Sequence, residues 1–90
     1  MVTDEPDLIR LSLPVDGGLT AIVEVAAGVL ARRAGLSDDV VTRARSAVSA
    51  AFTEVCGGGS GEVEVEVRVQ PHHLEVRIVS GAVTRTLHLP

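Results

Sequence analysis

The stretch that decides the fold is residues 35–55, GLSDDVVTRARSAVSAAFTEV. Ser37 is a good N-cap because its hydroxyl can accept a hydrogen bond from a free first-turn N–H, while Asp38 and Asp39 place negative charge at the positive end of the helix dipole. Apolar residues then recur at helical spacing, which predicts one buried stripe. The stripe consists of Val41, Ala44, Val48, Ala51, Phe52 and Val55. The stretch therefore predicts a capped amphipathic helix whose largest core side chain is Phe52.

The second half of this helix resembles a known family. Residues 47–54, AVSAAFTE, resemble the conserved-box helix of the anti-sigma-factor serine kinases, members of the histidine-kinase-like ATPase superfamily. In that family the run typically reads AVSEAITN. The resemblance covers roughly residues 8–80 and implies the front half of a histidine-kinase-like ATPase domain. It places the family's catalytic Glu at Ala50, its magnesium-binding Asn at Glu54 and its adenine-reading Asp at Gly81.

The residues at these three positions do not supply the family's chemistry. The methyl group of Ala50 can accept no proton. Glu54 keeps an oxygen that magnesium could use, but on a longer side chain. No Asn occurs anywhere in the chain, and no Asp follows Asp39. The resemblance therefore implies a non-catalytic regulatory module, with no cofactor and no metal site, that binds a sigma factor or a small antagonist protein.

Two alternatives stay open beside this interpretation. One is a divergent ATP-binding anti-sigma serine/threonine kinase, which would need a base that the sequence does not offer. The other is a structural or self-assembling domain unrelated to sigma regulation, because the matched run is short. For the regulatory module, four arginines are the candidate partner-binding residues, since interfaces prefer Arg to Lys and the chain has no Lys. They are Arg32, Arg33, Arg43 and Arg45, which could equally form a solvated surface.

Composition limits the remaining possibilities. Ninety residues allow one small domain, residues 1–90, of which 1–7 are expected to be a flexible N-terminus. The net charge of −4 and a single aromatic residue argue against nucleic-acid binding, and the acidity also disfavours an anionic membrane surface. The acidic start lacks the pattern of a signal peptide, and the lone Cys56 permits no intrachain disulfide. A cytoplasmic location is therefore expected.

The remaining chain predicts one further helix and four strands. A first strand is expected over 8–13, ended by Pro14, and a helix over about 19–33 that stops near Gly35. Its predicted buried stripe is Leu19, Ile22, Val23, Ala26, Val29 and Leu30. Gly28 inside this helix costs about 1 kcal/mol relative to alanine and is expected to permit close contact with another helix or the sheet. A Gly-rich loop over 57–61 precedes strands over 62–69, 74–80 and 83–89, with a turn at 70–73. The predicted fold is α+β, with two helices packed on one face of a four-stranded, largely antiparallel sheet.

Other residues that suggest chemistry have simpler explanations. The Gly-rich loop lacks the Lys-Ser/Thr pair of a phosphate-binding loop. His72 and His73 are adjacent, so their side chains are expected to point apart, and no metal-ligand spacing includes them. Cys56 is expected at the C-terminus of a helix, where the dipole opposes thiolate formation. The two outer strands carry no Lys and no internal Pro, which favours a weak homodimer through a sheet edge or the first helix.

Overall fold

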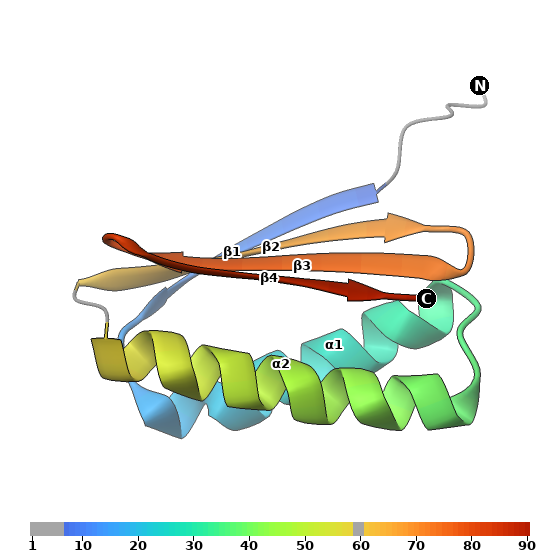
Figure 1. The fold of residues 1–90 in the computed structure, drawn as a ribbon, viewed down its shortest axis with the longest axis horizontal. Helices are drawn as coiled ribbons and strands as arrows, with labels where there is room; N and C mark the ends of the chain where they lie inside the picture. The colour runs from blue at the N-terminus through green and yellow to red at the C-terminus, as the bar shows by residue number, and fades with distance from the viewer. Residues whose placement is uncertain (1–6, 59–60) are drawn as a thin grey trace.

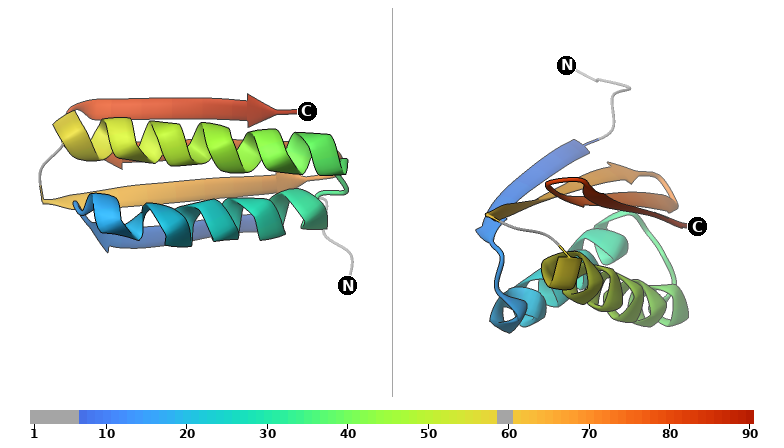
Figure 2. Two further views of the ribbon diagram at one scale, coloured as in Figure 1. Left: turned by 90° about the horizontal axis from the view of Figure 1, so that it is seen from below. Right: turned by 60° about the vertical axis from the view of Figure 1, so that its left-hand side comes forward.

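A computed structural model describes residues 7–58 and 61–90 of the chain (Figure 1). The elements are β1 (Asp7–Pro14), a 3-10 turn (Gly17–Leu19), α1 (Thr20–Arg33), α2 (Asp38–Gly58), β2 (Glu62–Gln70), β3 (His73–Ser80) and β4 (Val83–Leu89). The strands form one antiparallel sheet in the order β1-β2-β3-β4. Both helices lie on the same face of this sheet, side by side, with α1 nearer β1 and α2 nearer β4 (Figure 2). The predicted α+β fold is confirmed.

The sheet follows from strict alternation in β2. Its valines point toward the helices and are buried, while its charged residues face solvent. The register carries the apolar face across all four strands, because Val67 pairs with Ile9 on one side and with Val76 on the other, and Val76 pairs with Leu87. Cross-strand contacts between such branched side chains are what stabilises a sheet.

The predicted face of α2 is confirmed residue by residue. Its buried residues are Val41, Ala44, Val48, Ala51, Phe52 and Val55. The backbone N–H of Val40 donates to the Ser37 hydroxyl at 3.4 Å, so Ser37 caps the helix as predicted. Phe52 is 0% exposed and is the largest fully buried side chain of the core.

The predicted face of α1 is wrong in part. Ile22 and Val29, expected in the buried stripe, are 53% and 60% exposed, whereas Ala27 and Ala31 are buried beside Val23. The helix is apolar on nearly every side, so hydrophobic spacing could not select the inward face. Small residues face the core because α1 packs closely against α2 as well as the sheet. Large aliphatic side chains are thereby left on the outer surface of the helix layer.

Three element boundaries also differ from the predictions. The segment 57–61 is not entirely a loop, since α2 continues through Gly57 and Gly58, while Gly59 and Ser60 lie outside the described residues, as do residues 1–6. Pro14 belongs to β1, where an edge strand tolerates its missing N–H. The turn at 70–73 is tighter than predicted, because Gln70 and His73 already pair.

The β2–β3 turn anchors the end of α1. His72 adopts a left-handed backbone conformation with φ 58°, and its N–H donates to the carbonyl of Ala34 at 2.7 Å. Gly35, with φ 84°, ends α1 as predicted, and its N–H donates to the carbonyl of Arg32 at 3.0 Å. The contact holds the helix layer against one end of the sheet. Among the described residues, neither helix is long and apolar enough to cross a membrane.

Candidate functional site

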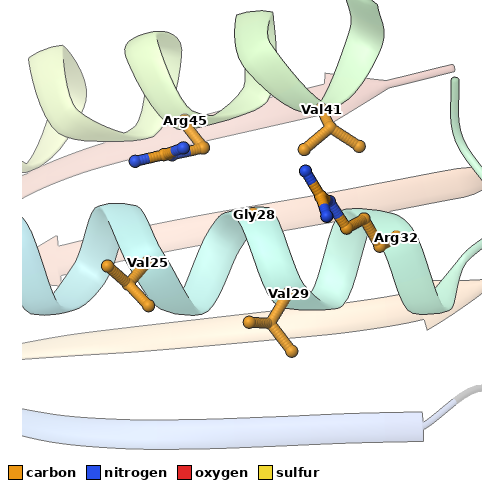
Figure 3. A pocket seen from close by; sticks show the side chains of 6 residues that line it. All are labelled: Val25, Gly28, Val29, Arg32, Val41 and Arg45. Carbon is orange, nitrogen blue, oxygen red and sulfur yellow. The ribbon is translucent and has the colours of Figure 1, made fainter. Parts of the chain in front are cut away.

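A groove runs between the two helices on the side away from the sheet. It has a volume of about 260 Å³ and is lined by Val25, Gly28, Val29, Arg32, Val41 and Arg45. Figure 3 shows the two guanidinium groups entering the space between the helices, Arg32 from α1 and Arg45 from α2. Aliphatic side chains and cationic groups therefore meet in one open depression.

Gly28 makes the geometry of this groove possible. A Cβ at this position would lie 2.9 Å from Cδ and 3.1 Å from Cγ of Arg45, closer than side-chain atoms normally approach. The Arg45 side chain therefore lies directly over the backbone of α1. From there its guanidinium reaches the Glu24 carboxylate at 3.1 Å. The sequence predicts a close contact at this glycine, and the contact is with an arginine side chain.

Apolar surface continues from the groove along α1. Ile22, Val25 and Val29 are each more than half exposed, at 53%, 57% and 60%. Their spacing of three and four residues places them along one side of the helix. We call these three residues the α1 stripe. Isolated exposed aliphatic residues are common, but a contiguous apolar patch rimmed by charge is typical of a binding surface.

The four arginines that the sequence singles out do not form one cluster. Arg32 and Arg45 line the groove, one from each helix, whereas Arg33 and Arg43 are exposed outside its lining. Two residues important to the groove were missed. Val25 was not assigned to any face of the first helix, and Gly28 was considered only for its close packing. A glycine inside an otherwise apolar helix was the available signal, because it is unfavourable there without a packing reason.

The positions that match the kinase family lie at the other end of α2. Ala50 is exposed, and Glu54 forms an ion pair with Arg85 of β4 at 3.2 Å. Gly81, with φ 60°, lies in the β3–β4 turn, which stands above the C-terminal end of α2 (Figure 1). The carboxylate of Glu54, the one oxygen ligand at these positions, is thus engaged by a guanidinium group.

His73, His88 and Cys56 contact other residues of the fold and do not form a common site. The ring of His73 stacks on that of His88 with centroids 5.8 Å apart, and His88 also lies 3.6 Å from the carboxylate of Glu75. Cys56 is partly buried against the core. Within residues 7–58 and 61–90, no three His, Cys, Asp or Glu side chains group closely enough to hold a metal ion.

Comparison with protein-family models and with curated proteins finds no match to this chain. The interpretation of the site therefore depends on its own geometry. An open groove with an aliphatic floor and two cationic side chains can bury apolar side chains of another molecule and pair with its carboxylates.

Proposed function

We propose that this chain is a non-catalytic regulatory module that binds a protein in the cytoplasm, with a sigma factor or a small antagonist protein as its partner. The observation that carries the proposal is the exposed α1 stripe beside the groove. The identity of the partner follows only from the resemblance of residues 47–54 to the anti-sigma-factor kinases. A regulator that works by binding needs an exposed surface of this kind and no reacting groups.

The surroundings of the family's catalytic positions support a role without phosphoryl transfer. Ala50 has no group that could orient or deprotonate a substrate hydroxyl. The Glu54 carboxylate already pairs with Arg85, whose positive charge opposes binding of a magnesium ion at the same group. A kinase of this family would need both functions at these two positions.

Co-purification tests the proposal directly. The tagged full chain would be expressed in its native cytoplasm, captured, and the accompanying proteins identified by mass spectrometry. We expect a sigma factor or a small antagonist protein to be enriched, and then to bind the purified chain in titration. Enrichment of neither class would contradict the proposed partner.

Calorimetric titration with magnesium and ATP tests the absence of nucleotide chemistry. We expect no heat of binding at physiological ATP concentration, because Ala50 and Gly81 replace the family's functional acids. A dissociation constant below about 1 mM, equivalent to roughly −4 kcal/mol, would contradict a non-catalytic module and favour the divergent kinase.

We also propose that the chain forms a weak homodimer. Strands β1 and β4 are the two edges of the described sheet, and β4 carries no Lys or Pro that would block pairing with another strand. Low affinity is expected because the surface offers no aromatic anchor, Phe52 being buried. Sedimentation over a concentration series would show a monomer–dimer equilibrium. A strictly monomeric species at about 100 μM, well above weak specific affinities, would contradict it.

A further inference from the structure

We infer that the groove between α1 and α2 is the docking site for an acidic amphipathic helix of the partner protein. The inference depends on the proposed function only in that the chain binds a protein. It adds which surface is used and which chemistry the surface recognises.

The shape of the groove fits a helix better than a small molecule. Its volume of about 260 Å³ is below the usual range for enclosed ligand sites, and it opens to solvent between two helices that run side by side (Figures 2 and 3). A third helix can lie along such a depression and insert side chains spaced three, four and seven residues apart. Val25 and Val29 of the α1 stripe line the groove, and Ile22 continues the apolar contact beyond it.

The charges around the groove select an acidic partner. Its lining contains two cations and no anion. Glu24 is the sole acidic residue of α1, and its carboxylate already pairs with Arg45. Because Glu24 balances Arg45, the net positive charge of the groove is that of Arg32, on a chain whose net charge is −4. Carboxylates of a docked helix would be attracted to Arg32 and Arg45, whereas a basic helix would be repelled.

The same charges disfavour a second copy of this chain as the occupant. Two copies that met groove to groove would bring their Arg32 guanidinium groups into one interface, where neither copy's lining supplies a carboxylate. Such like-charge juxtaposition is unfavourable across an interface. A second copy could instead insert the outer face of its α2. That face carries the hydroxyl groups of Thr42 and Ser46 and the charge of Arg43 in place of large apolar anchors.

Gly28 is a second observation about the groove, independent of its charges. Glycine inside a helix is less favourable than alanine by about 1 kcal/mol. No positive φ requires it here, because Gly28 has the regular geometry of α1. What alanine would disturb is the path of Arg45 across the helix and the depth of the groove floor.

A designed peptide provides the test. The probe is a fluorescein-labelled helical peptide of about 18 residues, roughly 27 Å long, with leucines along one face and glutamates beside them. The control peptide has lysine at every glutamate position. We expect fluorescence anisotropy to give a dissociation constant on the order of 100 μM for the acidic peptide and no saturation for the basic one. Equal binding of both peptides, or no binding of the acidic one at about 1 mM, would overturn the inference.

Matched variants locate the binding surface. Val29→Glu places a charge on the α1 stripe, and Leu8→Glu makes the same kind of change at a 43% exposed residue of β1, across the sheet from the helices. We expect Val29→Glu to weaken binding of the acidic peptide about tenfold or more, and Leu8→Glu to leave it unchanged. Equal loss in both variants, or no loss in Val29→Glu, would place the peptide elsewhere and refute the groove.

Gly28→Ala and amide shifts complete the design. Both glutamate variants change the net charge, whereas Gly28→Ala preserves it and alters only the groove floor and the Arg45 path. We expect weaker peptide binding by a fully folded Gly28→Ala protein.

In nitrogen-15 correlation spectra, the acidic peptide should shift the amides of Val25, Gly28 and Val41. Shifts confined to β1 or β4 would refute the inference.

These results separate the docking site from the proposed function. If a captured sigma factor or antagonist binds Val29→Glu as tightly as the parent chain, the groove is wrong and the proposed function stands. If the acidic peptide binds the groove but neither class of partner is captured, the groove stands and the proposed function is wrong.

Discussion

The stability of Gly28→Ala is decided by two opposing effects that the structure allows us to size. Gly28 lies inside α1, so alanine there favours the helix by about 1 kcal/mol. Its Cβ would approach Cδ of Arg45 to 2.9 Å. That carbon belongs to a flexible side chain, so the side chain can swing away while the backbone of α2 stays in place. The cost is then the loss of the Arg45–Glu24 ion pair.

This ion pair is weak enough for the helix effect to dominate. The two side chains are 46% and 35% exposed, and solvent-exposed pairs contribute about 0.2–1 kcal/mol. The free energy of unfolding of Gly28→Ala should therefore exceed that of the parent by about 0–0.8 kcal/mol, the difference between the two effects. In an Arg45→Ala background there is no side chain to displace. The same substitution should then stabilise the protein by the full amount of about 1 kcal/mol.

Urea unfolding measures the effect of Gly28→Ala in both backgrounds, with the parent, the two single variants and the double variant as the four proteins. Unfolding is followed by far-UV circular dichroism because the chain has neither Trp nor Tyr. The difference between the two backgrounds is the interaction energy between the new methyl group and Arg45. A gain from Gly28→Ala that is no larger without Arg45 would refute the reasoning, because the arginine would not be what the glycine accommodates. A loss above about 1 kcal/mol in both backgrounds would show that the helix backbone itself has to move.

Two further substitutions test the core and the β2–β3 turn by the same urea unfolding measurement. Phe52→Ala should lower the free energy of unfolding by about 3–5 kcal/mol, because it leaves a cavity where the largest fully buried side chain packs. A loss below about 1 kcal/mol would contradict this packing. His72→Val should cost more than about 1 kcal/mol because a β-branched residue is strained at φ 58°, whereas His72→Gly, which keeps the N–H bond to Ala34, should be nearly neutral. Equal effects of the two turn variants would exclude backbone strain as the cause.

The sheet and α2 could be predicted from the sequence because polar residues mark their outer faces. In β2, Glu64 and Glu66 alternate with valines, and a shift of one residue would bury these charges. In α2, polar residues such as Arg45 and Ser49 leave a single continuous apolar stripe. Each pattern had one arrangement that buried apolar groups without burying charge, so the inward face was determined.

The face of α1 could not be predicted in this way. Between Thr20 and Arg32 the helix carries one charged residue, Glu24, so several orientations bury similar apolar area. The choice among them depends on how closely α2 can approach, which is a tertiary property. Small side chains such as Ala27 and Ala31 permit the approach and become buried. The exposed surface of α1, and with it the groove, therefore emerges only in the folded chain.

The orientation of α1 has an energetic consequence for binding. Full burial of an aliphatic side chain contributes about 1.5–3 kcal/mol, so leaving Ile22, Val25 and Val29 more than half exposed forgoes several kcal/mol of possible stabilisation. Small domains have only about 5–15 kcal/mol of net stability, which makes this a substantial fraction. A partner helix that covers these side chains would recover the forgone burial as binding free energy, and Arg32 and Arg45 would restrict that gain to acidic partners. The stripe therefore lowers the stability of the free chain and would favour the proposed complex, which is the balance expected of a module that acts by binding.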